Sequence, residues 1–315
     1  MNIFSKDSFI YFVPWGVTTT FGEGTEMSFH SIMSVYHQLD NTHPFLNDLI
    51  NLQFIEPNQS IIDLNNAFYL KSKEIINDCN NDISLSEEKI RYLRMINEAS
   101  IDLNNMVYTD TLRLLNQKKR FILCGGEHGV GIGYLKALSE HNPHFSVLQI
   151  DSHMDCRQAY FGFDYSHASV MTHYSSFGQI DAITQVGIRD YDQSELEFQQ
   201  TQSTNFNLFT DYSIHKRLFE GESWSSIVDS IINTMSENVF ISLDVDGLMA
   251  YLCPNTGTPV PGGLNYNQLL YLFEKLYHSK KIIGAEIVEV NNPKNSTWDA
   301  NVGARLLQVI AGLLT

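Results

Sequence analysis

The sequence predicts an α/β protein with three layers, in which helices cover both faces of a central, mainly parallel sheet. Short apolar runs alternate with amphipathic stretches from about residue 120 to the C-terminus, and this alternation is typical of parallel sheets covered by helices. No internal repeat, flexible linker or long run of like charge divides the 315 residues. We therefore expect a single domain over residues 1–315.

The elements follow from the period of the apolar residues. Strands are expected at Phe121–Cys124, Phe145–Ile150, Ala182–Ile188, Val239–Leu243 and Ile282–Val290. Helices are expected at Val130–Glu140, Trp224–Met235, Tyr266–Tyr277 and Val302–Leu314. The first third should add an edge strand at Phe9–Val13, a second strand near Ser60–Leu64 and a long helix over roughly Glu87–Gln117, whereas Asn41–Glu56 shows no interpretable pattern.

Composition and net charge indicate which classes of molecule can be partners of this chain. The chain carries 36 acidic and 20 basic side chains, a net charge of −16, so its field attracts cations and repels nucleic acid and anionic lipid. Acidity of this degree is also common in proteins that are merely soluble. No apolar stretch is long enough to span a membrane, and Met1–Val13 lacks the features of a signal peptide. We expect a cytoplasmic protein with no membrane or nucleic-acid partner.

The four cysteines are Cys79, Cys124, Cys156 and Cys253. They lie far apart and form no Cys-x-x-Cys pair, so we expect reduced, structural thiols and no zinc knuckle.

Polar clusters follow four of the expected strands directly. They are Gly125-Gly126-Glu127-His128, Asp151-Ser152-His153-Met154-Asp155, Asp244-Val245-Asp246, and Glu286 with Glu289. In an open parallel sheet these positions are the carboxyl ends of the strands, where such folds build their sites. Each cluster alone is weak evidence for a functional site, because similar short motifs usually belong to ordinary loops or to the hydrogen-bonded core. Together they predict one site.

Spacing predicts that the site binds metal. Alternate residues of extended backbone point the same way, so Asp151, His153 and Asp155 can share a pocket, as can Asp244 and Asp246. With His128 the set holds four carboxylates and two imidazoles, which would be costly to bury without cations. Oxygen and nitrogen ligands without thiolate favour Mn²⁺, Fe²⁺, Ni²⁺ or Zn²⁺ over Ca²⁺, and four carboxylates indicate two ions.

These motifs resemble those of the ureohydrolases, the family of arginase and agmatinase. The family's Gly-Gly-Asp-His, Asp-x-His-x-Asp, Ser-x-Asp-x-Asp and Glu-Val-Asn patterns correspond here to residues 125–128, 151–155, 242–246 and 289–291, and residues 256–264 resemble a family loop. The resemblance is strong over residues 120–315 and faint earlier, through Thr18–Thr25. It implies an arginase-like fold and assembly as a homo-oligomer, a trimer or hexamer.

The resemblance also implies roles for individual residues. His128, Asp151, Asp155 and Asp244 would hold one metal ion, and Asp151, His153, Asp244 and Asp246 the other. The expected ions are Mn²⁺, with Ni²⁺ as the alternative. They would generate a hydroxide that attacks the guanidinium carbon of the substrate. Glu289 would anchor the guanidinium and His167 would shuttle a proton to the leaving amine. Asp155 and these two residues form the expected catalytic set.

The chain departs from the family pattern near the site. Glu127 stands where Asp is commoner, Gly129 replaces a serine, Met249-Ala250 replace an Asp-Pro, and Met27-Ser28 replace a Gly-Pro. None is a ligand, so we expect these departures to alter the surroundings of the metals and not their ligands.

The substrate is the least determined part of the prediction. Arg157 stands where arginases have an asparagine, and residues 155–169 resemble the agmatinase branch, so a small cationic guanidinium compound, agmatine, is expected to yield putrescine and urea. Arg157 would instead favour an anionic tail if it faces the pocket, whereas Asp192 could offset it. Guanidinobutyrate, formiminoglutamate and guanidine therefore remain alternative substrates. A non-catalytic, metal-binding homologue is a further alternative.

Overall fold

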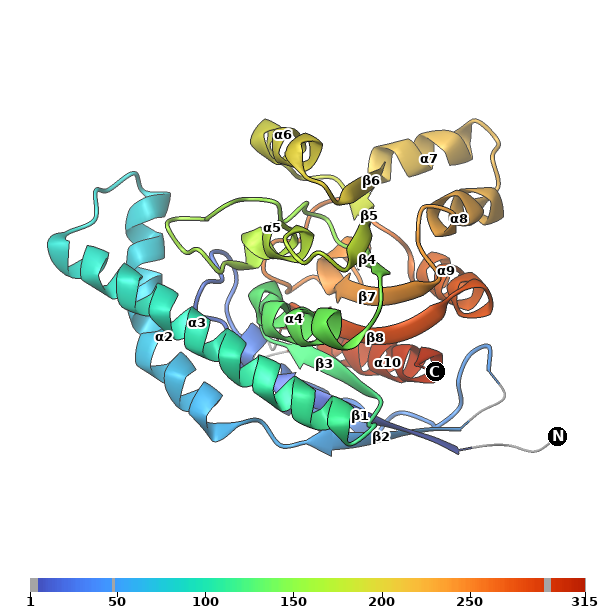
Figure 1. Ribbon diagram of the computed structural model, residues 1–315, viewed down its shortest axis with the longest axis horizontal. Helices are drawn as coiled ribbons and strands as arrows, with labels where there is room; N and C mark the ends of the chain where they lie inside the picture. The colour runs from blue at the N-terminus through green and yellow to red at the C-terminus, as the bar shows by residue number, and fades with distance from the viewer. Residues whose placement is uncertain (1–4, 47–48, 292–295, 315) are drawn as a thin grey trace.

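The chain forms one continuous sheet with helices on both sides. The structure is a computed structural model that describes residues 5–46, 49–291 and 296–314. Within these residues eight strands, all parallel, lie in the order β2-β1-β3-β8-β7-β4-β5-β6 (Figure 1). Their bounds are β1 Ser5–Val13, β2 Leu49–Ile55, β3 Phe121–Gly125, β4 Phe145–Ile150, β5 Ile180–Ile188, β6 Asn205–Thr210, β7 Asn238–Asp244 and β8 Lys281–Val288.

The helices complete three layers. They are α1 Ser28–Tyr36, α2 Gln59–Asn80, α3 Glu87–Asn116, α4 Gly131–His141, α5 Val170–Ser175, α6 Gln193–Thr201, α7 Asp211–Phe219, α8 Trp224–Ile232, α9 Tyr266–Ser279 and α10 Trp298–Leu313. Alternate strand residues enter different cores, as the two-residue period requires. In β3, Phe121 and Leu123 pack with α2–α5, whereas Ile122 and Cys124 pack with α1 and α8–α10.

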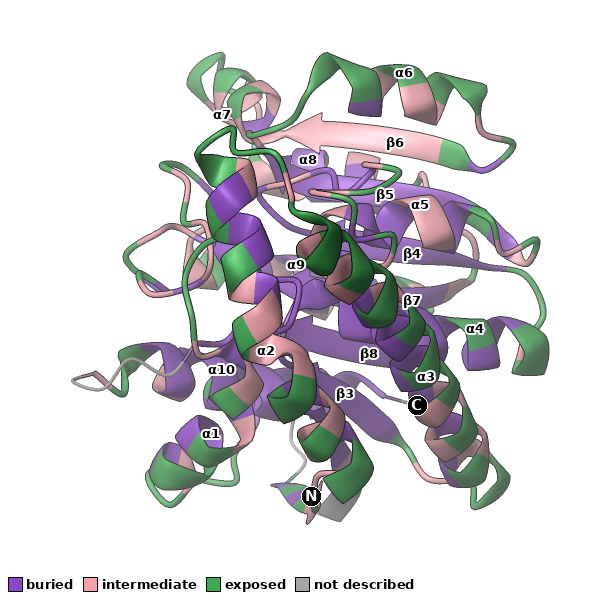
Figure 2. Cartoon of the chain, turned by 90° about the vertical axis from the view of Figure 1, so that its left-hand side faces the viewer, coloured by how far each residue is buried: buried purple, intermediate pink, exposed green. Residues whose placement is uncertain are grey.

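Burial follows the layers. The central strands are buried, the helices expose their outer faces, and the edge strand β6 is only half-buried (Figure 2). A strand covered on both faces has a continuous run of apolar residues, which explains why β3 and β4 could be predicted from the sequence. No helix in the described ranges is long and apolar enough to cross a membrane.

The predicted fold class is confirmed, with two errors in the first third of the chain. Ser60–Leu64 is not a strand but the start of α2, whose N-cap Asn58 accepts a hydrogen bond from the Ser60 amide. A short apolar run fits a strand or a buried helix equally well. Phe9–Val13 does lie in a strand, but β1 is not at the edge because β2, within the unassigned region, pairs with its outer side. Strand β6 was not anticipated.

The strand order brings the predicted clusters together. The four strands that precede them, β3, β8, β7 and β4, are neighbours in the middle of the sheet. Because all four are parallel, their carboxyl ends lie at one edge of the sheet, and residues far apart in sequence meet there.

Candidate metal centre and active site

The first ligand group is presented by the turn that follows β3. The backbone of Gly126 passes so close to that of Trp15 that a Cβ at this position would overlap the Trp15 carbonyl group. Two hydrogen bonds tie this turn to the segment after β1, from Gly126 N to Val13 O at 3.0 Å and from Glu127 N to Trp15 O at 2.9 Å. His128 then begins a 3₁₀ turn and is fully buried.

The hydrogen bonds around His128 define its tautomer. Ser242 Oγ donates to Glu286 Oε1 at 2.7 Å, so its oxygen can accept from His128 Nε2, 2.9 Å away. In the neutral ring, which is the form that binds metal, the proton therefore lies on Nε2 and Nδ1 carries a lone pair. Tyr174 also donates to Glu286 Oε1, at 2.8 Å, which fixes that carboxylate. A hydrogen-bonded partner behind the ring is the usual support of a metal-binding histidine.

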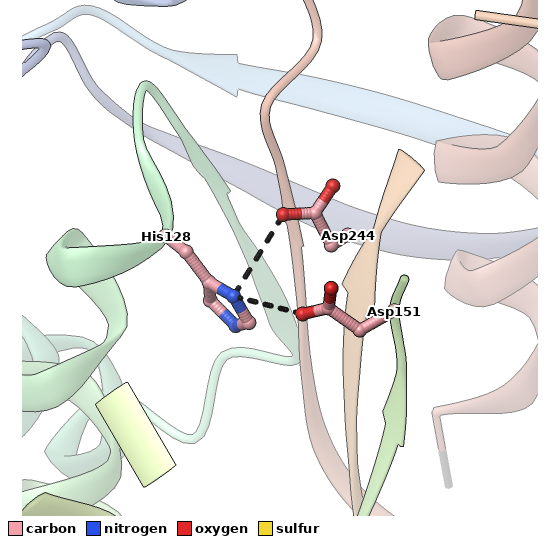
Figure 3. Close-up of side chains that lie close together, drawn as sticks. All are labelled: His128, Asp151 and Asp244. Atoms are coloured by element: carbon pink, nitrogen blue, oxygen red, sulfur yellow. Dashed lines mark ion pairs between the residues drawn. The ribbon is translucent and has the colours of Figure 1, made fainter. Parts of the chain in front are cut away.

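The lone pair of His128 faces carboxylate oxygens. Its Nδ1 lies 2.8 Å from Asp155 Oδ2, 3.4 Å from Asp151 Oδ2 and 3.8 Å from Asp244 Oδ2. Figure 3 shows the ring with Asp151 and Asp244 on the same side. Nδ1 is buried without a hydrogen-bond partner, and lone pairs that face one another across these distances repel unless a cation lies among them.

A second group adjoins the first. Ligand atoms of Asp151, His153 and Asp246 lie within 4.8 Å of one another, as do those of His128, Asp151 and Asp244. His153 Nδ1 is 3.0 Å from Asp246 Oδ2. Asp151 belongs to both groups, as a carboxylate between two ions would.

Local hydrogen bonds aim these carboxylates. Asp151 Oδ1 accepts from the His153 amide at 2.7 Å, and Asp244 Oδ1 accepts from the Asp246 amide at 2.8 Å. The Asp-x-His and Asp-x-Asp spacings therefore each close a short turn that turns the free oxygens inward. Gln149 Nε2 donates to Asp151 Oδ2 at 2.8 Å from within β4.

The charges of this cluster fit two divalent cations. Burial and the Asp151 carboxylate raise the pKa of Asp155 to about 7, and burial and Asp246 raise the pKa of Asp244 well above its usual value. Without cations the cluster thus resists full ionisation. The donor set of four carboxylates and two imidazoles without thiolate suits Mn²⁺, Fe²⁺, Ni²⁺ or Zn²⁺.

Glu289 faces the same cavity from the end of β8. Its Oε1 accepts from the His128 amide at 3.0 Å, whereas Oε2 is buried without a hydrogen-bond partner. Burial and Glu127 raise the pKa of Glu289 to about 8. Glu289 and Asp155 have positive φ, 61° and 54°, a conformation that costs free energy in non-glycine residues and is common at functional sites.

His167 also borders the cavity. Its Nε2 lies 3.3 Å from Thr20 Oγ1, and its backbone amide donates to Thr18 Oγ1 at 3.3 Å. Burial, then the nearby His153 and Lys73, lowers the pKa of His167 to about 3, so the ring is neutral near pH 7.

Two connected cavities open over the cluster. The inner one is lined by Thr19, Phe21, His128, His153, Asp155, His167, Asp244, Asp246, Thr256, Gly257, Thr258 and Glu289. The outer one shares Phe21, His153, Asp155, His167 and Thr258 with it, and adds Thr20, Arg157, Tyr160, Ala168, Asp190, Tyr191 and Glu195. The atom-free space, including the open mouth, is about 310 Å³ in the inner and 520 Å³ in the outer cavity. A substrate head and tail can therefore occupy adjoining spaces.

The two residues expected at the substrate tail lie in different places. Arg157 lines the outer cavity, with its guanidinium 3.7 Å from Glu195 Oε2 and 5.0 Å from the centre of the Tyr160 ring. Asp192 does not line either of these two cavities. It is the N-cap of α6, where its Oδ1 accepts from the Ser194 amide at 2.8 Å. The neighbouring Asp190 lines the outer cavity instead.

Several residues of the site were not singled out from the sequence. Ser242 supports His128, Gln149 supports Asp151, and Lys73 from α2 donates to Thr19 O at 2.7 Å beside the cavity. Glu195 is also new, although the spacing Asp192-x-x-Glu195 is that of a capping box and marks this helix start in the sequence. The four cysteines are free, as expected.

This fold and these two ligand groups together define an α/β protein with a candidate binuclear metal site. Comparison with known proteins identifies the family of this chain. The chain belongs to the arginase family, whose sequence model matches residues 6–312, and it is a hydrolase of the ureohydrolase type.

Individual relatives agree with this assignment. An N(1)-aminopropylagmatine ureohydrolase of Thermus thermophilus is 33% identical over 210 residues, which cover 67% of this chain and 68% of that protein. An agmatinase of Pyrococcus horikoshii is 29% identical over 202 residues, covering 64% and 65%. Among solved structures, the agmatine ureohydrolase of Thermoplasma volcanium superposes with a TM-score of 0.69 at 21% identity, covering 98% of this chain and 89% of that one. Arginase from Bacillus subtilis has a TM-score of 0.69 at 19% identity and covers 98% of each chain. These two structures support the fold.

Proposed function

We propose that this enzyme releases urea from a guanidinium compound with a cationic tail, with agmatine as the first candidate and putrescine as its product. The observation that carries the proposal is the buried, unpartnered Oε2 of Glu289. It lines the same cavity as the ligand groups, and a guanidinium is the planar cation that a carboxylate binds through paired hydrogen bonds.

The reaction adds one water to the guanidinium carbon and releases urea and the free amine. Divalent cations held by the two ligand groups would supply Lewis acidity and lower the pKa of the attacking water. Glu289 would hold the guanidinium carbon over the ligand groups, an orientation that reduces the entropy cost of the reaction. Asp155 would contribute both as a ligand and by its charge. The His167 ring, which borders both cavities and is neutral near pH 7, would relay a proton to the departing amine: one ring nitrogen takes up the proton lost by the attacking water as the other releases its own.

The charges of the outer cavity favour a cationic tail. The positive charge of Arg157 faces the Glu195 carboxylate, which is almost fully buried and also accepts from the Cys156 and Asp192 amides at 3.0 and 2.9 Å. Glu195 is therefore held in place beside Arg157. Asp190 adds a further carboxylate to this lining, so an ammonium group meets a net negative surface.

A longer polyamine tail is the second candidate. The outer cavity has more atom-free space than the inner one, and some relatives are named N(1)-aminopropylagmatine ureohydrolase. Such a substrate would place its second amine beyond Asp190, which is exposed at 67% of its side chain.

The test is urea release from a substrate panel by apo-enzyme reloaded separately with Mn²⁺ and Ni²⁺. The panel contains agmatine, N(1)-aminopropylagmatine, arginine, guanidinobutyrate and guanidine, with formiminoglutamate followed by its own loss because it yields formamide. We expect turnover of the first two above the others. Preference for an anionic substrate would contradict the cationic-tail proposal. No turnover by protein with two bound metal ions would favour the non-catalytic alternative.

Three broader features belong to the same proposal. We propose Mn²⁺ as the resident metal with Ni²⁺ as the alternative, a homo-oligomer that is a trimer or hexamer, and a cytoplasmic location. Metal analysis of protein purified without added metal tests the first, light scattering the second and cell fractionation the third.

A further inference from the structure

Glu127 holds the segment Thr18–Thr20 through both of its carboxylate oxygens. Oε1 accepts from the Thr18 hydroxyl at 2.5 Å, and Oε2 accepts from the Thr18 amide at 2.8 Å and from the Thr19 hydroxyl at 3.1 Å. Glu127 is fully buried. Hydrogen bonds to a buried carboxylate are stronger than neutral ones, so this side chain fixes the segment firmly.

The segment that Glu127 holds is part of the cavity wall and contacts His167 twice. The Thr18 hydroxyl donates to Glu127 and accepts from the His167 amide, while the Thr20 hydroxyl lies 3.3 Å from His167 Nε2. Thr19 lines the inner cavity and Thr20 the outer one. A continuous chain of hydrogen bonds therefore runs from Glu127 through Thr18 to His167.

A cation from another layer supports this arrangement. Lys73 reaches from α2 to donate to Thr19 O at 2.7 Å. It opposes the cost of burying the Glu127 charge, which hydrogen bonds alone would not fully offset. Three separate parts of the chain thus meet around the Glu127 carboxylate. They are the turn after β3, the loop after β1, and α2.

Gly129 provides the space for a side chain as long as glutamate. A Cβ on Gly129 would lie 3.4 Å from Glu127 Oε1 and 3.1 Å from Tyr165 O. A serine hydroxyl would extend beyond that Cβ and crowd one of these neighbours, whereas a shorter aspartate at 127 would vacate space beside it. The two departures from the family pattern, at 127 and 129, therefore lie beside each other.

We propose that Glu127 is a positioning residue that sets His167 and the cavity wall through Thr18–Thr20, and that Gly129 is its necessary partner. The proposal rests on the proposed function for its kinetic consequence. Glu127 lines neither cavity, and its hydrogen bonds to the cavity wall are those with Thr18 and Thr19.

The test is a double-mutant cycle of Glu127→Asp, Gly129→Ser and the combined variant, with Glu140→Asp as a matched control. Glu140 is an exposed helix residue whose carboxylate accepts from Tyr108, so its shortening repeats the chemical change far from the site. We expect Glu127→Asp to lower kcat about 10-fold at unchanged metal content, since it loses at least one charged hydrogen bond. The combined variant should recover to within about 3-fold of wild type, because the serine fills the vacated space.

A second readout does not depend on any substrate. Amide hydrogen exchange of the peptide over residues 15–22 should quicken roughly 10-fold in Glu127→Asp and return towards wild type in the combined variant. Thr18→Val, which removes the bridging hydroxyl at nearly constant volume, should reproduce the kcat loss. Independent effects of the two substitutions, or metal loss in proportion to activity, would overturn the proposal. If wild type turns over no substrate, the proposed function fails, while the exchange data still decide whether Glu127 and Gly129 hold the segment together.

Discussion

Removal of one buried hydroxyl should weaken metal binding without removing a ligand. In Ser242→Ala the Nε2–H of His128 loses its acceptor, 2.9 Å away in the native structure. The ring then gains by placing its proton on Nδ1, where Asp155 Oδ2 lies at 2.8 Å. That tautomer cannot bind a cation, so the metal must displace a hydrogen bond that wild type does not form.

The magnitude follows from the burial of the group. An unsatisfied buried donor costs about 1–3 kcal/mol, and loss of a partner behind a metal ligand typically weakens affinity about 10- to 100-fold. These ranges overlap near 1.4–2.7 kcal/mol. We expect the metal held by His128 to bind about 10- to 100-fold more weakly, with kcat largely restored at saturating Mn²⁺.

The assay is a competitive chelator titration with metal analysis, and Ser146→Ala is its control. Ser146 is also a fully buried serine on the sheet, and its hydroxyl bonds to Ser236 Oγ at 2.9 Å, away from the ligands. Equal weakening in both variants would show a general loss of stability. Native affinity in Ser242→Ala would refute the tautomer argument.

Three further outcomes are expected. Glu289→Gln should lower kcat/KM about 100-fold or more at full metal content, because an amide cannot pair a guanidinium charge; a change below about 3-fold would contradict the anchoring role. Chelation of the metals should lower Tm by roughly 4 °C for each ion held, relative to enzyme in metal at 100-fold excess over Kd, since that excess contributes about 2.7 kcal/mol per ion and a 315-residue chain unfolds with an entropy of about 0.66 kcal/mol/K; an unchanged calorimetric Tm would argue against metal binding to the native state. Burial raises the pKa of every cysteine thiol, most strongly in Cys124, Cys156 and Cys253 and least in the half-buried Cys79. Because a raised pKa leaves fewer thiolates at pH 8, Ellman's reagent should react first with Cys79 and with the other three only on unfolding. Rapid reaction of all four cysteines would disprove their burial.

The sequence was sufficient for the ligand groups because their geometry is local. Asp151 and His153 are two residues apart after a buried strand, as are Asp244 and Asp246, and a parallel sheet brings such strand ends to one edge. The apolar sequence pattern of a central strand is a strong signal for the strand's position in the chain. Ser60–Leu64 failed the same test because a short apolar run does not distinguish a strand from the first turns of a helix.

What the sequence could not show is which distant side chains meet the site. Lys73 reaches the Thr19 carbonyl, beside the cavity, only because α2 packs beside the loop after β1, and no local pattern specifies that approach. Asp192 shows the converse. It was expected to offset Arg157 at the substrate tail, yet its carboxylate caps α6. Competition between capping and ligand binding is decided by tertiary structure.

In the proposed function, the reaction and its specificity depend on different parts of the fold. The ligand groups and Glu289 lie at the ends of four adjacent central strands, which packing holds rigid on both faces. The outer cavity is built by loops and the start of α6, where Arg157 meets Glu195. An anionic tail would compete with Glu195 for Arg157, and the buried Glu195 carboxylate would then keep only its hydrogen bonds from the Cys156 and Asp192 amides. A cationic tail requires no such rearrangement, and this difference in cost favours amine-bearing substrates.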